Sequence, residues 1–220
     1  MGVAPKSCLL FFGAPGSGKG TQSEVLEKKH NFKHISTGDI FRENLKKETH
    51  LGIEAKKFID AGNLVPDDVT LKMLKSAIQE TTQNSFIIDG FPRNLNQARQ
   101  LEVLSEELNF NIKSVVFLEV PDEVLFERLT GRRVCKSCSA VYHISYKPSK
   151  KDGICDVCGG EVYQRKDDSR DVISHRLKTY AQSTFPVKNF YEEMGILEIV
   201  DGQGQQSDIE KRIEFIIKEF

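Results

Sequence analysis

Short, unbroken apolar runs alternate with longer segments of helical periodicity along most of the chain. Runs that are apolar at every position are typical of strands covered on both faces, as in a parallel sheet. The pattern predicts strands at residues 8–12, 33–35, 85–89, 114–118 and 196–200. It predicts helices at about residues 19–30, 67–81, 96–107, 122–129, 171–192 and 206–219. This alternation favours a doubly wound α/β sheet, in which ligands bind beyond the carboxyl ends of the strands.

Two segments interrupt the alternation. Residues 36–66 are polar and helical, and we name them the helical insertion. Residues 131–168 hold four of the five cysteines and show little helical periodicity, and we name them the cysteine insertion. We interpret both as insertions into one sheet domain, which then comprises residues 1–35, 67–130 and 169–220.

A glycine-rich turn follows the first predicted strand and opens the first predicted helix. It reads Gly13-Ala14-Pro15-Gly16-Ser17-Gly18-Lys19-Gly20-Thr21. This context is the one that a phosphate-binding loop requires, because glycines let backbone N–H groups surround an anion at the positive end of a helix. Lys19 is then placed to reach the terminal phosphates. The general pattern has a hydroxyl directly after the lysine, so Gly20 leaves open whether Thr21 binds magnesium.

Asp89 ends a predicted strand at the sheet edge that also carries the phosphate loop. A carboxylate there can hold magnesium, directly or through water, although an isolated aspartate would more simply be a turn residue. Arginines gather in the neighbouring loops and around the cysteine insertion, namely Arg42, Arg93, Arg128, Arg132, Arg165 and Arg176. Guanidinium groups stay charged and pair with phosphate oxygens, which suits phosphoryl transfer. A phosphate acceptor needs no general base, because its oxygen is already ionised near neutral pH.

The cysteines of the second insertion form two pairs, Cys135-x2-Cys138 and Cys155-x2-Cys158, separated by sixteen residues. That spacing is typical of a tetrahedral structural zinc site. The alternatives are four unligated thiols or a redox pair, and the latter is disfavoured because neither pair begins a helix after a strand. A short insertion has little core of its own, so a metal would supply folding free energy.

Charge and composition narrow the class of protein. The 220 residues include 31 Lys and Arg against 32 Asp and Glu, for a net charge of -1. This balance argues against nucleic acid or an anionic membrane as a partner recognised by bulk charge. No apolar run approaches the length of a membrane-spanning helix. Cysteines without a leader sequence indicate a reducing compartment, so we expect a cytoplasmic protein.

Further motifs occur in order along nearly the whole chain and are similar to those of adenylate kinases. They are Ser36-Thr37-Gly38-Asp39-Ile40-Phe41-Arg42, Asp89-Gly90-Phe91-Pro92-Arg93, Gly131-Arg132-Arg133 and Arg165-Lys166-Asp167-Asp168. With the phosphate loop and the four cysteines, the chain resembles the long-lid form of the adenylate kinase family. The resemblance implies a P-loop fold with a five-stranded parallel sheet, a helical segment that binds the monophosphate, and a zinc-ribbon-like lid. It also implies reversible, magnesium-dependent phosphoryl transfer from ATP to AMP, giving two ADP, for adenine nucleotide homeostasis.

The resemblance implies residue roles as well. AMP would be held by Thr37, Gly38, Arg42, Leu64, Val65, Gly90, Arg93, Gln97, Arg165 and Arg176, with Gln97 contacting adenine. ATP would be held by the loop from Gly13 to Thr21, by Arg128 against adenine, and by Arg132 and Tyr142. The catalytic residues would be Lys19, Arg93, Arg132, Arg165 and Arg176. Asp89 would act on magnesium through water, and Cys135, Cys138, Cys155 and Cys158 would hold a structural zinc. The helical insertion would close over AMP and the cysteine insertion over ATP, in a monomer.

Other functions fit some of these features. A kinase for GMP, UMP or CMP would share the fold, but related UMP and CMP kinases tend to lack the threonine found here as Thr37. A GTPase switch would need a guanine-reading N-K-x-D segment, which the sequence lacks. A zinc-ribbon module that binds nucleic acid would need a basic and aromatic surface, which the balanced charge disfavours.

Overall fold

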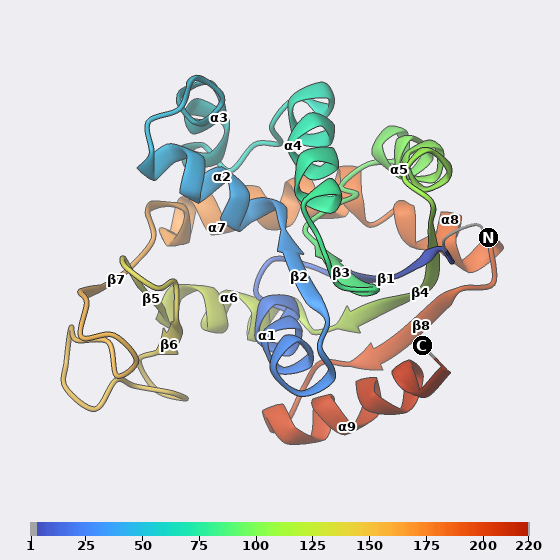
Figure 1. Cartoon of the computed structure of the whole chain (residues 1–220). Helices are drawn as coiled ribbons and strands as arrows, with labels where there is room; N and C mark the ends of the chain where they lie inside the picture. Colours follow the sequence, from blue (N-terminus) through green and yellow to red (C-terminus); the bar gives the residue numbers. More distant parts are fainter. Residues whose placement is uncertain (1–3, 220) are drawn as a thin grey trace.

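The protein is described by a computed structural model of residues 4–219, built around a five-stranded parallel sheet (Figure 1). The strands are β1 (Lys6–Phe12), β2 (Lys33–Ser36), β3 (Ser85–Asp89), β4 (Phe110–Glu119) and β8 (Leu197–Asp201). Their spatial order is β2-β3-β1-β4-β8, which puts β1 at the centre. The predicted doubly wound α/β sheet is confirmed, and each predicted strand is present.

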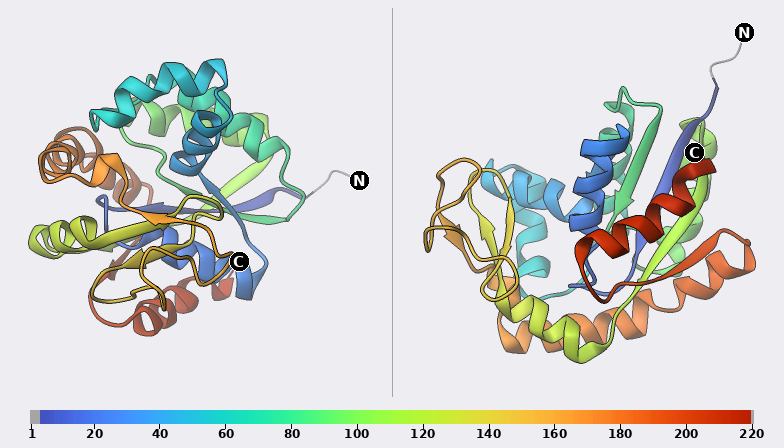
Figure 2. Two further views of the ribbon diagram at one scale, coloured as in Figure 1. Left: turned by 90° about the vertical axis from the view of Figure 1, so that its left-hand side faces the viewer. Right: turned by 90° about the horizontal axis from the view of Figure 1, so that it is seen from below.

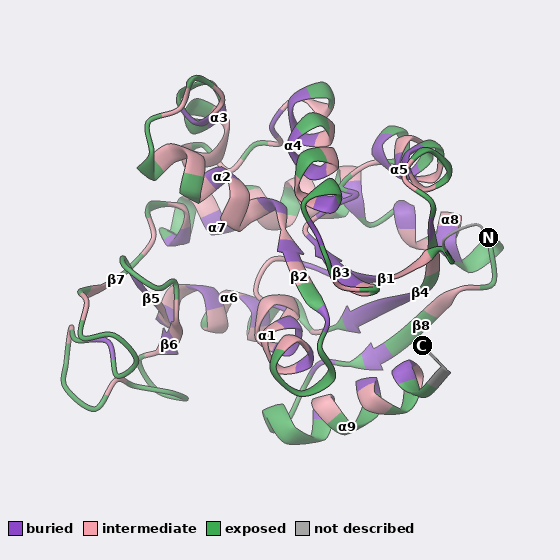
Figure 3. Cartoon of the chain, in the orientation of Figure 1, coloured by how far each residue is buried: buried purple, intermediate pink, exposed green. Residues whose placement is uncertain are grey.

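Helices cover both faces of this sheet. They are α1 (Lys19–His30), α4 (Asp67–Gln79), α5 (Leu95–Glu107), α6 (Asp122–Gly131), α7 (Arg170–Thr179), α8 (Val187–Glu193) and α9 (Gln206–Ile216), followed by a 3₁₀ turn at Ile217–Glu219. The helices α4, α5 and α8 pack against one face, and α1 and α9 against the other. Figure 3 shows the buried residues concentrated on the strands and on the inner sides of these helices.

The central place of β1 between two helical layers explains why its last five residues, Cys8–Phe12, are apolar at every position. Leu10 and Phe12 join the hydrophobic cluster on one face, whereas Leu9 and Phe11 join the cluster on the other. All four side chains are buried. Successive strand residues point to opposite faces, so a strand between two helical layers needs no polar side.

The register of the strands brings the candidate site residues to one edge of the sheet. Phe11 of β1 pairs with Asp89 at the end of β3, and Ser36 at the end of β2 pairs with the same Asp89. The glycine-rich turn after β1 and the first residues of the helical insertion therefore flank one carboxylate. This is the edge at which the sequence predicts ligand binding.

The two insertions have structures of their own. The helical insertion contains α2 (Thr37–Lys46) and α3 (His50–Asp60), which share a small apolar cluster with α4. The cysteine insertion contains β5 (Arg132–Cys135), β6 (Val141–His143) and β7 (Val162–Tyr163), which form an antiparallel sheet in the order β6-β5-β7, and a 3₁₀ turn at Lys166–Asp168. In Figure 2 the cysteine insertion extends away from the main sheet, on the side of α2 and α3.

One predicted helix is wrong as a single element. Instead of one helix over 171–192, α7 gives way to a π-helical turn at Tyr180–Thr184, and α8 starts after Pro186. The amide of Phe185 bonds to the carbonyl of Tyr180, five residues back, which marks the wider turn. Phe185 and Pro186 keep helical backbone angles, but proline has no N–H with which to continue the ladder of helical hydrogen bonds. Within residues 4–219, no helix combines the length and apolarity needed to cross a bilayer.

The junction between α6 and the cysteine insertion is closely packed at Gly131. A Cβ atom at this position would stand 2.1 Å from Nε2 of His143. The imidazole cannot easily turn away, because its Nδ1 accepts hydrogen bonds from the amides of Ser145 and Tyr146, and its ring stacks on Tyr146. Glycine is therefore required here by close approach.

We expect Gly131→Ala to destabilise the protein by about 1–3 kcal/mol, as is typical of overpacking. At this chain length each kcal/mol lowers the midpoint of thermal unfolding by about 2–4 °C. Thermal denaturation followed by circular dichroism measures the shift. The double variant Gly131→Ala/His143→Ala should recover part of the loss, and an unchanged midpoint in the single variant would contradict the packing argument.

Candidate active site

A cavity of about 870 Å³ lies at the carboxyl edge of the sheet. Its wall includes the glycine-rich turn, Asp89 and side chains of both insertions. A second, smaller space of about 70 Å³ lies beside the helical insertion. Three arginines line both spaces, namely Arg42, Arg93 and Arg176. The two spaces therefore meet at a cluster of positive charge.

The glycine-rich turn wraps back on its own lysine. Nζ of Lys19 donates to the carbonyls of Gly13 and Ala14, at 2.8 and 2.9 Å. Gly16 and Gly18 have φ angles of 86° and 103°, which side chains with a Cβ rarely adopt, and Gly18 caps the start of α1. The loop thus meets the helix N-terminus, as an anion site requires. Eight of the nine predicted loop residues line the cavity, and the ninth, Ala14, accepts a hydrogen bond from the lysine through its carbonyl.

Asp89 and Lys19 lie together with a histidine that the sequence argument missed. Nε2 of His34 stands 3.6 Å from Oδ2 of Asp89. Burial opposes the charge of Asp89, but His34 and Lys19 outweigh it and lower the pKa of the carboxyl group. Asp89 is therefore ionised and faces the cavity near Gly20, so it is available to a hydrated cation. Burial lowers the pKa of Lys19 to about 8, and Asp89 offsets this only in part.

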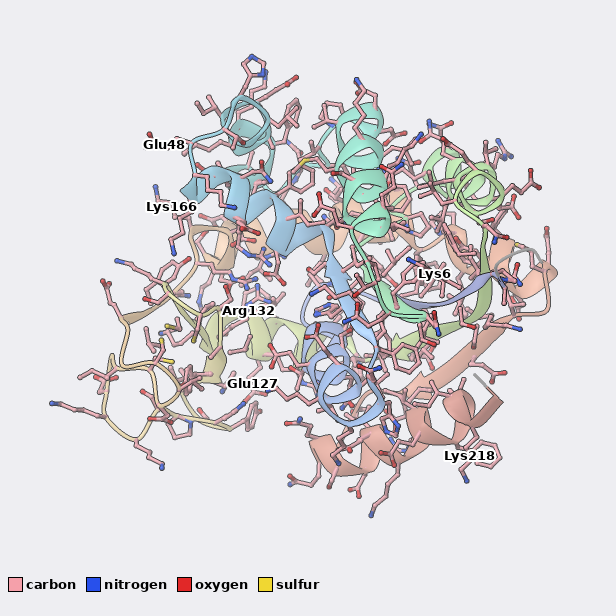
Figure 4. All side chains as sticks on the ribbon, in the orientation of Figure 1. Lys6, Glu48, Glu127, Arg132, Lys166 and Lys218 are labelled. Atoms are coloured by element: carbon pink, nitrogen blue, oxygen red, sulfur yellow. The ribbon has the colours of Figure 1, made fainter. Side chains whose placement is uncertain are left out.

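A buried carboxylate holds two of the arginines in place. Asp168 accepts from Nε of Arg132 at 2.8 Å and from Nη1 of Arg176 at 3.1 Å. Asp167 adds a second ion pair to Arg176, also at 3.1 Å. Burial opposes the charge of Arg132, but the pair with Asp168 outweighs it and raises the pKa of Arg132. Figure 4 shows Arg132 where the cysteine insertion joins the rest of the molecule.

The remaining arginines are less fully neutralised. Arg42 pairs with Asp39, and Nε of Arg93 donates to the carbonyl of Gly90 at 2.7 Å. Nε of Arg165 is enclosed without a hydrogen-bond partner among residues 4–219. Burial lowers the pKa of Arg165 to about 9, and nearby Arg42 contributes. Arg93 also lines the cavity. The surrounding protein lowers the pKa of Arg93 to about 10, and the like charge of Arg176 contributes. The unpartnered Nε of Arg165 and the guanidinium of Arg93 that lines the cavity suit an anionic ligand.

The residues predicted to hold a monophosphate line the smaller space or its junction with the cavity. Thr37, Val65 and Gln97 line the smaller space, Gly38 and Leu64 line both, and Gly90 lines the main cavity. The hydroxyl of Thr37 donates to the carbonyl of Gly90 at 3.0 Å, which ties the helical insertion to the loop after β3. The structure thus brings these predicted residues together.

The predicted ATP side lies at the other end of the main cavity. Arg128 donates to the carbonyls of Gly202 at 2.9 Å and Ser17 at 3.4 Å, so it joins the glycine-rich turn to the loop after β8. Tyr142 lines the cavity, but its hydroxyl is engaged within the cysteine insertion, 3.3 Å from Sγ of Cys155. If Tyr142 contacts ATP as predicted, the contact must therefore be made by its aromatic ring, because its hydroxyl is already engaged.

The four cysteines of the insertion converge on one point. Their sulfur atoms all lie within 4.8 Å of one another, with Cys135 and Cys158 at 3.5 Å and Cys138 and Cys155 at 3.5 Å. Four sulfurs about 2.3 Å from a zinc ion would stand at similar separations, so the set fits tetrahedral zinc. The hydrogen bond from Tyr142 lowers the pKa of Cys155 to about 6, which favours the thiolate that a metal needs.

The comparisons with known proteins agree with this geometry. The adenylate kinase family model matches residues 11–196. An adenylate kinase of Caldicellulosiruptor bescii is 47% identical over 206 residues, which cover 93% of this chain and 96% of that protein. Adenylate kinases of Caldicellulosiruptor saccharolyticus and Staphylococcus aureus are 46% and 45% identical over the same shares. The chain belongs to the adenylate kinase family.

Membership of the adenylate kinase family confirms the resemblance drawn from the motifs. Sequence reasoning missed the partners that organise the arginines and the amide of Gln97, chiefly Asp168 and Asp67. Asp168 was visible in the motif Arg165-Lys166-Asp167-Asp168, but nothing in the sequence showed that it faces Arg132. The one sequence feature that could have pointed to His34 is its place two residues before the motif that begins at Ser36.

The low pKa of Lys19 predicts a pH dependence for nucleotide binding. Phosphate oxygens bind the charged amine, which is populated below pH 8 and lost as the pH rises through 8. ATP binding at pH 8.5 should therefore be coupled to proton uptake. Isothermal titration calorimetry in buffers of different ionisation enthalpy measures this uptake. Lys19→Arg keeps the charge and stays protonated, so its uptake should be smaller. Equal uptake by both proteins would contradict the assignment to Lys19.

Proposed function

We propose that this protein transfers the terminal phosphoryl group of ATP to AMP, reversibly, and releases two ADP. The observation that carries the proposal is the meeting of two binding spaces at Arg42, Arg93 and Arg176. One space contains a phosphate loop and the other an amide suited to a base. An enzyme that joins two phosphates needs such a junction, since their negative charges must be held side by side.

The residues divide the work of positioning. Lys19 and the glycine-rich turn hold the phosphates of ATP, and Arg42 and Arg93 hold the phosphate of AMP. An oxygen of AMP attacks the terminal phosphorus of ATP, and the bond to the bridging oxygen of the ADP leaving group breaks. Arg132, Arg165 and Arg176 stabilise the charge on the transferring group. Closure of the two insertions excludes water, which would otherwise accept the phosphoryl group.

Magnesium belongs to this proposal through Asp89. The carboxylate is ionised and faces the cavity beside Gly20, which leaves room for a hydrated ion. Bound with ATP, magnesium neutralises charge on the phosphates. Asp89 would hold the ion through water. We further propose that the enzyme is a cytoplasmic monomer and that residues 36–66 and 131–168 are its moving parts.

A substrate panel tests the proposed function. ADP formation from ATP is measured with AMP, GMP, CMP and UMP in turn, with magnesium present. We expect strong preference for AMP. Arg93→Ala protein prepared in the same way should lose activity by orders of magnitude, which excludes a contaminating kinase. Preference for another monophosphate would keep the mechanism and change the substrate. Transfer to none of them would overturn the proposal.

Zinc in the cysteine insertion is proposed to stabilise and to take no part in the chemistry, since four protein ligands leave no open position. Cys155→Ser should therefore lose zinc and lower the midpoint of thermal unfolding, while activity measured in the cold persists. Metal analysis and calorimetry measure both. Cys8→Ala, in the core of the sheet, should retain the zinc. Loss of activity in the cold by a Cys155→Ser protein that lacks zinc but remains folded would contradict a purely structural role.

A further inference from the structure

The amide of Gln97 is fixed in one orientation by two contacts. Its Oε1 accepts a hydrogen bond from the backbone amide of Arg93 at 2.7 Å. Its Nε2 donates to Oδ1 of Asp67, also at 2.7 Å. The side chain is 1% exposed, and it lines the smaller space beside the helical insertion. A carboxamide has two N–H donors and two acceptor lone pairs, so one of each remains.

Asp67 is itself held by a network of donors. Its Oδ1 also accepts from Nδ2 of Asn94 at 3.0 Å, and its Oδ2 accepts from Nδ2 of Asn96 at 2.7 Å. The side chain of Asn94 in turn accepts from the amide of Gln97 at 2.8 Å and caps α5. Asp67 belongs to the first turn of α4, so the network ties the start of one helix to the start of the next.

Turning the amide of Gln97 over would meet repulsion on both sides. Oε1 would then face the carboxylate of Asp67, which can only accept. Nε2 would face the N–H of Arg93, which can only donate. The hydrogen bonds that Asp67 receives from Asn94, Asn96 and Gln97 lower the pKa of its carboxyl group, although burial opposes this, so it stays ionised. Each of the two restraints thus adds its own cost to the flipped amide, and removing one of them lowers the total cost.

The orientation of this amide matters because purines differ in the order of their polar groups. Adenine presents a donor at its 6-amino group and an acceptor at N1. Guanine and hypoxanthine present an acceptor at O6 and a donor at N1–H. An amide free to turn can pair with either arrangement, whereas a fixed amide can pair with one. The residue that fixes the amide therefore contributes to the choice of base.

We propose that Asp67 is a specificity-determining residue, which selects a 6-amino purine over a 6-oxo purine by holding the amide of Gln97 in one orientation. The inference rests on the proposed function, because it concerns the base of the monophosphate acceptor. Asp67 acts through Gln97 and is a positioning residue. No other described side chain contacts Nε2 of Gln97 in the hydrogen bonds of residues 4–219.

The test compares AMP with IMP as acceptors, because IMP differs from AMP only in its 6-oxo group and the proton at N1. For the wild-type protein, kcat/KM should be much higher with AMP. In Asp67→Ala the ratio of the two values should fall about tenfold, as expected for one lost hydrogen-bond restraint. The fall should come from weaker use of AMP together with improved use of IMP.

A neighbouring residue supplies the matched control. Asp68 lies in the same first turn of α4, is exposed, and pairs only loosely with Lys72 at 3.8 Å. Asp68→Ala removes the same charge from the same helix end, so it should leave the ratio unchanged. If Asp67→Ala fails to fold, Asp67→Asn keeps the side-chain volume. Its amide can pair with Gln97 in either orientation, so the ratio should fall in this variant too.

A double-mutant cycle separates positioning from a merely structural role. In a Gln97→Leu background, Asp67→Ala should cause no further change in the ratio. A fall that persists without Gln97 would overturn the proposal, and so would equal losses with AMP and IMP in Asp67→Ala. The wild-type measurement tests a different claim. A wild-type enzyme that does not prefer AMP would overturn the proposed function and this inference together.

Discussion

The confinement of like charges at one edge of the sheet is the constraint on which the structure depends. Lys19 and six arginines line the cavity, and neighbouring like charges among them raise the electrostatic cost of one another. The fold offsets this cost with carboxylates that take no ligand themselves, above all the buried Asp168. Among residues 4–219, Arg93 and Arg165 form no ion pair, so their charge is available to the phosphates that we propose to bind here. An anionic ligand in the cavity would therefore lower the electrostatic repulsion among these side chains.

The parallel sheet is what makes this arrangement possible. Its strands all end at one edge, so segments far apart in the chain deliver their loops to the same place. Asp89 pairs in register with both neighbours, which fixes the carboxylate between the glycine-rich turn and the helical insertion. The two layers of helices bury the strands on both faces. The positions of the loops at this edge thus derive from a hydrophobic core that lies behind them.

Much of this could be predicted from the sequence, and the reason is that it depends on local patterns. Fully apolar runs predicted the strands, and the spacing of the glycines before Lys19 predicted the phosphate loop. The spacing of the four cysteines indicated that they would form one metal-binding cluster. What could not be predicted depends on partners distant in the chain. The pairing of Gln97 with Asp67 spans 30 residues and that of Arg132 with Asp168 spans 36. The break of the predicted helix at Tyr180–Thr184 required knowledge of how Pro186 would be accommodated.

The ion pair between Arg132 and Asp168 also closes the cysteine insertion at its base. Arg132 is the second residue of that insertion and Asp168 is its last, so the two ends are clamped side by side, with β5 and β7 paired just above them. The residues between Arg132 and Asp168 thus form a loop whose two ends meet at this ion pair. A change of sequence or length within this segment would therefore leave the arginine at its base clamped by Asp168. The cysteine insertion is in this sense modular, because its own core of cysteines is separate from the ion pair that anchors it.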